Sequence, residues 1–182
     1  MLAAATLILL FSGCSLLEET LPGVTLSDSN VVSVLDRLGQ GAIETAMLAR
    51  DKAVSPEVKA FAARVVNDHR ALDKADGRLA EDLALHPQAS LLTSQLMQAD
   101  EDAMRALRAT SGAAFDRAYV EYEIKRHVRA FNFVQAAADT ETTLELKQQL
   151  VRIGPDLLSH ISAARALERH LGAEPPNAVA VR

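Results

Sequence analysis

The chain has 182 residues, of which 49% are hydrophobic, and it contains no tryptophan, eight glycines and six prolines. This composition favours close-packed helices over a β fold, and the length suffices for one domain with a sizeable core. The formal net charge of −5, without a basic cluster in the sequence, argues against nucleic acid as a partner.

The N-terminal segment 1–13 carries no charged residue and is too short to cross a bilayer as a helix, which needs about 20 apolar residues. It is typical of the apolar part of an export signal that ends in small residues. The stretch Phe11-Ser-Gly-Cys14 resembles a bacterial lipobox, although Phe11 replaces the usual leucine and no Lys or Arg precedes it. We therefore predict that Cys14 is lipidated, and Ser15 after it favours anchoring to the outer membrane, on the periplasmic side. The alternative is an ordinary cleaved signal with an incidental thiol.

The rest of the chain divides into three parts. Residues 14–27 are predicted to be a tether, residues 28–172 a helical-bundle domain, and residues 173–182, with Pro175-Pro176, a disordered tail. Because Cys14 is the only cysteine, no intrachain disulfide can form and the folded part has no thiolate for catalysis or metal binding.

Apolar residues recur at steps of three and four along five segments, which predicts five amphipathic helices. Helix-start and helix-stop residues mark their ends, such as a serine cap among residues 27–29, Ser55-Pro56, and Pro87. The predicted helices cover approximately residues 28–52, 56–86, 90–109, 112–138 and 144–171.

Short turns join the first predicted helix to the second and the fourth to the fifth, so each pair should form an antiparallel hairpin. The third helix, of about 20 residues, spans roughly 30 Å and can return the chain to the starting end of the bundle. The fourth helix then runs parallel to the second. We therefore predict an all-α fold, a ferritin-like antiparallel four-helix bundle with an extra shorter crossover helix.

Three histidines, His69, His127 and His160, lie on the apolar stripes of three different helices. Counted from a common end of the bundle, they fall within about one helical turn, or roughly 6 Å, of one another. Glu123 and Glu44 fall at a similar height. The three imidazoles could bind zinc, copper or iron, with Glu123 or Glu44 as a further ligand or as a hydrogen-bond partner of a histidine. The alternative is a polar layer in which each imidazole bonds a carboxylate, a tyrosine or water.

Charged residues near the histidines carry their own expectations. Glu123 precedes His127 by four residues and Asp156 precedes His160 by four, a spacing at which a carboxylate can hold an imidazole. Asp68 is rotated about 100° from His69 around its helix, so it is expected to face solvent or an arginine. Arg126 is expected to be solvated or paired with a nearby acid.

Five stretches of the chain match a known family in order and spacing: Ile43-Glu44-Thr45, Ser55 to His69, Ser111 to Tyr119, Lys125-Arg-His127, and Gly154 to His160. In these stretches the sequence resembles the domain of unknown function 4142 family of bacterial exported proteins. The resemblance implies a ferritin-like bundle in the periplasm or outer membrane, and it implies no particular activity.

The functional prediction depends on the residues around the histidines, which lack the motif of a di-iron site. A carboxylate-bridged di-iron site needs Glu-x-x-His motifs, but Val66, Ile124 and Leu157 stand three residues before the histidines. No serine lies in a nucleophile elbow, so no catalytic residue is predicted. We therefore predict a lipid-anchored envelope protein with a non-enzymatic binding or stress-related role, whose one predicted partner is the membrane. The alternative is a metal-binding or redox bundle that uses the three-histidine layer.

Overall fold

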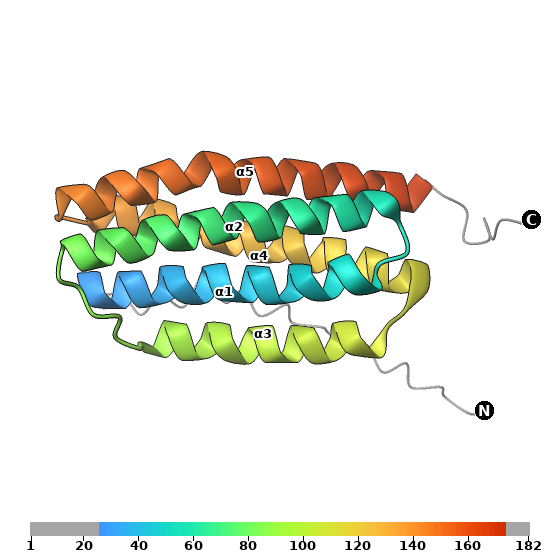
Figure 1. Cartoon of the computed structure of the whole chain (residues 1–182), viewed down its shortest axis with the longest axis horizontal. Helices are drawn as coiled ribbons and strands as arrows, with labels where there is room; N and C mark the ends of the chain where they lie inside the picture. Colours follow the sequence, from blue (N-terminus) through green and yellow to red (C-terminus); the bar gives the residue numbers. More distant parts are fainter. Residues whose placement is uncertain (1–25, 174–182) are drawn as a thin grey trace, which may run out of the picture.

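The predicted amphipathic segments form five α-helices in the computed structural model, which describes residues 26–173 (Figure 1). The predicted export signal, Cys14, most of the tether and nearly all of the tail lie outside the described residues. The helices are α1 (Asp28–Lys52), α2 (Pro56–Asp82), α3 (Leu91–Ala109), α4 (Gly112–Thr140) and α5 (Leu144–Ala173).

The helix ends reflect local side-chain chemistry. Ser27 caps α1 by accepting a hydrogen bond from the backbone N–H of Asn30 at 3.2 Å, which satisfies a donor that the first turn leaves free. Ser55 caps α2 in the same way. The end of α2 was predicted too late, because the chain turns at Ala84, whose φ is 51°. The N–H groups of Ala84 and Leu85 bond back to the last turn, as in a Schellman motif, although glycine is the usual residue there.

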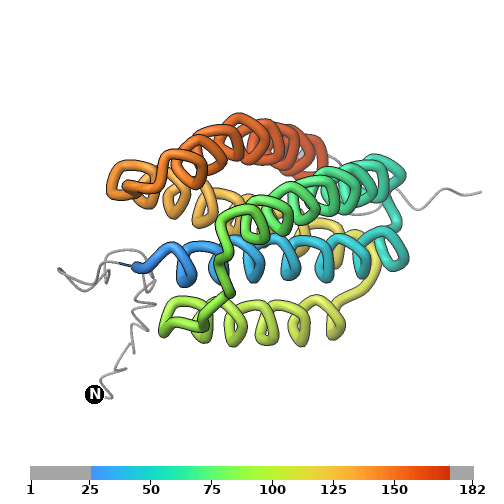
Figure 2. Tube along the Cα trace, turned by 60° about the vertical axis from the view of Figure 1, so that its left-hand side comes forward, coloured from blue at the N-terminus to red at the C-terminus, as the bar shows by residue number. Residues whose placement is uncertain are grey.

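Four long helices enclose the core, and the shorter one lies outside them. Around the ring, α1 packs on α2, α2 on α5, α5 on α4 and α4 on α1, while α3 packs against α1 and α4. Figures 1 and 2 show that α2 and α4 run in one direction and that α1, α3 and α5 run in the other. This arrangement confirms the predicted ferritin-like bundle with a crossover helix.

The core consists of two apolar clusters with a polar layer between them. One cluster includes Val34 and Leu150, and the other includes Val65 and Phe115. Full burial of such a side chain stabilises the fold by about 1.5–3 kcal/mol. The layer between the clusters includes the buried polar and charged residues His69, Glu123, Arg126, His127 and His160.

The outer helix α3 is fastened to the bundle by a buried ion pair. Asp100 of α3 accepts hydrogen bonds from Arg37 at 3.0 Å and from the Tyr122 hydroxyl at 2.7 Å, and it pairs with Arg126. The Arg126 guanidinium also donates to the carbonyl of Leu38 at 2.6 Å. The expected acid partner of Arg126 is thus Asp100, but Arg126 is fully buried rather than solvated. Removing one partner of a buried pair costs about 3–5 kcal/mol, so this contact fixes α3.

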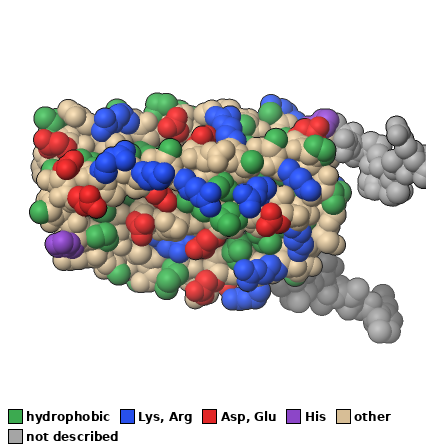
Figure 3. All heavy atoms as spheres, in the orientation of Figure 1, with side chains coloured by type: hydrophobic (Ala, Val, Ile, Leu, Met, Phe, Trp, Pro, Cys, Tyr) green, Lys and Arg blue, Asp and Glu red, His purple; other side chains and the backbone are tan. Residues whose placement is uncertain are grey.

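The surface has a mixed character. In the view of Figure 3, several basic side chains form a band across the middle of the bundle, with acidic side chains on either side of it and apolar side chains between them. Among the described residues, none of the helices combines the length and the apolar character needed to cross a membrane.

Gly41 of α1 makes room for the ion pair that fastens α3. A Cβ atom at Gly41 would lie 2.2 Å from an Asp100 carboxylate oxygen and 2.4 Å from an Arg126 nitrogen. Gly77 of α2, by contrast, has open space around it.

We predict that Gly41→Ala lowers the free energy of unfolding by about 1–3 kcal/mol, because the methyl group displaces a buried ion pair. Gly77→Ala is the matched control and should raise it by about 0.5–1 kcal/mol, since alanine is the better helix former. Urea unfolding followed by circular dichroism measures both. Equal stabilisation by the two changes would show that the ion pair does not need the space at Gly41.

Candidate metal centre

Three helices bring their histidines together in the polar layer. His69 of α2, His127 of α4 and His160 of α5 have ring centroids 5.0 to 5.5 Å apart. One ring nitrogen of each lies within 4.8 Å of those of the other two. Their exposed fractions are 5%, 1% and 2%, respectively. The common height counted from the sequence is therefore the height at which the side chains meet.

The hydrogen bonds of His127 define which of its nitrogens faces the cluster. Its Nδ1 lies 2.9 Å from the backbone carbonyl oxygen of Glu123. A carbonyl only accepts, so Nδ1 carries the hydrogen and Nε2 has the free lone pair in the neutral ring. That Nε2 lies 3.3 Å from Nε2 of His69.

His160 is held in the opposite tautomer. Its Nε2 lies 2.9 Å from the Oδ2 atom of Asp68, and a carboxylate oxygen accepts, so Nε2–H donates. The lone pair of the neutral ring is then on Nδ1, which is buried and has no hydrogen-bond partner among the described residues. The lone pair that His160 can offer to a ligand is therefore on Nδ1.

Burial keeps the first two histidines neutral. It lowers the pKa of His69 to about 3, and the nearby His160 and Arg126 act in the same direction. Burial together with His69 and His160 holds the pKa of His127 well below its usual value. A neutral imidazole has a lone pair available for a metal ion, whereas a protonated one does not.

Glu123 supplies a carboxylate beside the histidines. Its side chain is 0% exposed, and Oε1 accepts a hydrogen bond from the Thr45 hydroxyl at 2.8 Å. The other oxygen, Oε2, lies 3.3 Å from Nδ1 of His127 but makes no hydrogen bond. Burial raises the pKa of Glu123 to about 7, although Arg126 and Thr45 act in the opposite direction.

Four buried polar atoms in and beside this layer have no hydrogen-bond partner within the described part of the chain. They are Nδ1 of His69, Nδ1 of His160, Oε2 of Glu123 and the Tyr119 hydroxyl. Leaving such a group unpaired costs about 1–3 kcal/mol. A polar layer satisfied by the protein's own groups would not leave these atoms without partners. The described residues therefore leave hydrogen-bonding capacity unused in this layer.

Two carboxylates expected near the histidines lie elsewhere. The Glu44 side chain is 51% exposed and pairs with Arg37 at 3.2 Å, so the structure does not bring Glu44 to the cluster. Its neighbour Thr45 points inward instead and bonds Glu123. Asp156 is exposed, and the carboxylate that holds His160 is Asp68.

Asp68 is the residue whose role the sequence did not reveal. Asp68 is rotated about 100° from His69 around α2, so its side chain points away from the centre of the bundle. In that direction it faces the neighbouring helix α5. There it bonds His160, and on its own helix it also pairs with Arg64 at 3.3 Å. The arginine partner that was expected for Asp68 is Arg64. Its contact with His160 was not expected from the sequence.

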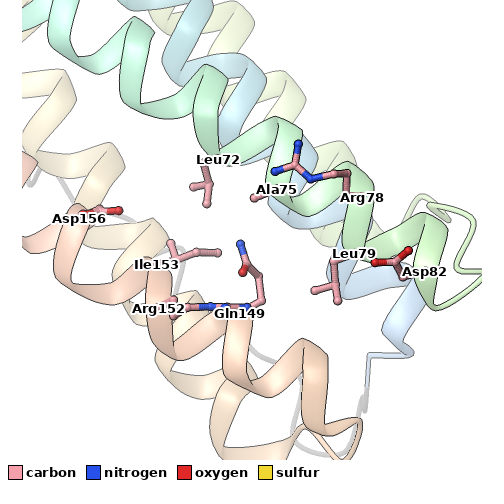
Figure 4. Close-up of a pocket in the computed structure, with 9 residues that line it drawn as sticks. All are labelled: Leu72, Ala75, Arg78, Leu79, Asp82, Gln149, Arg152, Ile153 and Asp156. Atoms are coloured by element: carbon pink, nitrogen blue, oxygen red, sulfur yellow. The ribbon is translucent and has the colours of Figure 1, made fainter.

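The seam between α2 and α5 is grooved on both sides of this contact. Figure 4 shows one groove, which includes Leu72, Leu79 and Gln149 in its lining. The other groove, towards the start of α2, includes Ala60, Phe61 and Leu167. The contact between Asp68 and His160 therefore closes the middle of a seam that is open on either side.

Comparison with known proteins assigns the chain to a family. The model of a domain of unknown function, DUF4142, matches residues 18–167. The chain belongs to the DUF4142 family. The matched range includes all three histidines of the candidate centre, together with Asp68 and Glu123.

Comparison with individual proteins found a structural neighbour of the DUF4142 chain but no match among curated sequences. The fold of this chain is similar to the crystal structure of a Streptomyces coelicolor protein that is named as a secreted protein, DUF305. The TM-score is 0.66 at 16% sequence identity, over 81% of this chain and 98% of the other. At this identity the likeness concerns the fold alone.

Asp76, which accepts a hydrogen bond from Gln149, is expected to make the stability of the DUF4142 domain depend on pH. Burial raises its pKa to about 6, and Asp73 and Asp36 add to the shift. A bond from Gln149 at 2.6 Å partly opposes it. A carboxyl group with a raised pKa in the folded state destabilises the fold once it ionises, so stability falls as the pH rises from about 4 to about 6.

We predict that Asp76→Asn raises the free energy of unfolding by about 1 kcal/mol at pH 8, a value reduced to allow for partial exposure. Near pH 4 the gain should vanish, because the aspartate is then protonated as well. Denaturant unfolding at both pH values measures the difference, with Asp102→Asn at an exposed site as the control. A gain that is the same at both pH values would contradict this explanation.

Proposed function

We propose that this protein is a metal-binding helical bundle of the bacterial cell envelope, which holds one transition-metal ion on His69, His127 and His160. The observation that carries the proposal is that three buried imidazoles converge while the layer leaves polar atoms unpaired. A bound ion would take the unused lone pair of His160 Nδ1 and would replace the contact between the Nε2 atoms of His69 and His127. We thus favour metal binding over a role that leaves the histidine layer without a ligand.

The spacing of two of the nitrogens fits a metal site. Zinc binds histidine nitrogens at 2.0–2.1 Å, so two such nitrogens at a tetrahedral angle lie about 3.3 Å apart. The Nε2 atoms of His69 and His127 are 3.3 Å apart. The third histidine has a ring nitrogen within 4.8 Å of ring nitrogens of the other two, so a side-chain movement can complete the set of ligands.

The ligand chemistry selects a class of ion. Imidazole nitrogens suit zinc, copper and iron, whereas magnesium and calcium prefer oxygen ligands. Glu123 is a buried carboxylate beside Nδ1 of His127, and we propose that it orients this ligand from the side of the ring away from the ion. A di-iron centre needs a glutamate from each of four helices, and Glu123 is the one glutamate that the described residues place in this layer.

The expected role is binding, such as the storage, sequestration or delivery of an ion. The polar layer offers ligands, and we assign no side chain to nucleophilic or general acid–base chemistry. The centre also lies under a closed surface, since each of its histidines is at most 5% exposed. A buried centre of this kind suits retention of the ion better than turnover of a substrate.

We predict that untagged protein binds about one equivalent of zinc, copper or iron, and no magnesium. His127→Ala should lose this binding because it removes one of the three ligands, whereas His86→Ala, at an exposed position, should retain it. Elemental analysis after dialysis and calorimetric titration measure the stoichiometry. Failure of all three transition metals to bind, or equal binding by both variants, would contradict the proposal.

The envelope location is a further part of the proposal and is supported by the sequence of the N-terminal segment. Cys14 follows an uncharged apolar stretch that ends in Ser12-Gly13, as in lipoprotein signals. Lipidation of Cys14 would tether the bundle to the outer membrane through the residues before α1.

We predict that a palmitate analogue labels the protein in bacterial cells and that Cys14→Ala abolishes the labelling, because the acyl chain is attached through the cysteine. Gel fluorescence of the purified protein measures the label. Persistent labelling of the variant would show that the signal is of another type.

A further inference from the structure

We infer that Asp68 is a positioning residue for the metal centre, and that Asp68, Arg64 and Ser159 together form a latch over the route by which the ion enters and leaves. This inference rests on the proposed metal-binding function. It assigns a solvent-facing side to a centre that is otherwise enclosed.

The positioning role follows from the tautomer of His160. Asp68 accepts the hydrogen bond of Nε2–H at 2.9 Å, which leaves the lone pair on the buried Nδ1. Without the carboxylate, His160 could move its hydrogen to Nδ1 and withdraw that lone pair from the cluster. Carboxylates that orient ligating histidines contribute about 10–100-fold to metal affinity.

Asp68 can fill this role because it reaches both the interior and the solvent. Its side chain is 45% exposed, while that of His160 is 2% exposed. Asp68 thus lies directly outside a ligand of the proposed centre, in hydrogen-bond contact with it.

Arg64 turns this contact into a bridge between two helices. Its Nε lies 3.3 Å from Oδ2 of Asp68 on α2, and its Nη2 donates to the Ser159 hydroxyl of α5 at 2.7 Å. Ser159 is the residue before His160. The arginine therefore ties α2 to α5 directly above the histidine, at the point where the two grooves of the seam approach each other.

Towards α3 and towards α1, the centre is closed by buried contacts. The groove between α1 and α3 reaches Asp100 and Arg37, but the buried pair of Asp100 with Arg126 separates it from the histidines. Towards α1, the hydrogen bond between Thr45 and Glu123 is fully buried. The latch is formed by side chains that are partly exposed, so it is the contact that opens at the lowest cost.

The two parts of the latch should have separable effects. Asp68→Ala should weaken zinc affinity about 10–100-fold, because His160 loses its orientation. Arg64→Ala should accelerate zinc transfer to a chelator at least several-fold, with affinity changed much less, because it opens the route without touching a ligand.

The controls break a similar ion pair that lies far from the centre. Asp102 and Arg105 pair at 3.1 Å on the exposed face of α3. Asp102→Ala and Arg105→Ala should leave both zinc affinity and the rate of transfer as in the unaltered protein. Competition titration and stopped-flow mixing with a chelator measure the two quantities in all five proteins.

A second measurement tests the positioning role without any metal. Long-range proton–nitrogen NMR of the metal-free protein should show His160 hydrogenated at Nε2, and Asp68→Ala should shift the hydrogen towards Nδ1. Hydrogenation at Nδ1 in the unaltered protein would overturn the positioning role, whether or not zinc binds.

Zinc release from Arg64→Ala at the unaltered rate would overturn the latch. Failure of the unaltered protein to bind zinc, copper and iron alike would overturn both the proposed function and the latch, while the NMR result still decides the role of Asp68.

Discussion

The desolvation of a polar layer in the middle of an apolar core is the constraint on which the rest of this bundle depends. Two apolar clusters lie on either side of the layer and supply the burial that drives folding. The layer itself opposes folding unless its groups find partners. Arg126 and Asp100 form one such pair, Thr45 satisfies one oxygen of Glu123, and the histidines remain partly unsatisfied.

This constraint links features that are far apart in the sequence. The crossover helix α3 connects the two hairpins, but it also brings Asp100 to the buried Arg126, which lies one residue before His127. The small size of Gly41 allows that pair to form against α1. The same layer that costs stability thus positions α3, and it also holds the ligands of the proposed centre. A polar group kept in a core at such a cost is more readily explained by function than by stability.

Much of the architecture was predictable because it depends on spacing along the chain. Apolar periodicity determines which face of each helix is buried, and a fixed rise per residue converts residue numbers into heights. This is why the common level of His69, His127 and His160 could be counted before any coordinates. The end of α2 was predicted less well, because Ala84 adopts a left-handed conformation that glycine or asparagine usually signals.

The contacts around the histidines could not be predicted in the same way, because they depend on how each helix is rotated against its neighbours. A rotation of one residue exchanges Glu44 for Thr45 at the centre, and it decides that Asp68 meets α5. Asp100 did carry a signal, since it occupies a position on the apolar stripe between Leu96 and Leu107. A single acid on such a stripe indicates a buried partner, but the sequence does not say which helix supplies it.

The proposed centre holds one metal ion on three imidazoles inside the bundle. X-ray absorption spectroscopy of the zinc-loaded protein tests this arrangement most directly, because it reports the type and distance of the atoms around the ion. We expect a single zinc environment with three imidazole nitrogens at about 2.0–2.1 Å and one further light ligand. A shell made only of oxygen atoms, or one with a single imidazole, would place the ion on the surface and contradict the proposed centre.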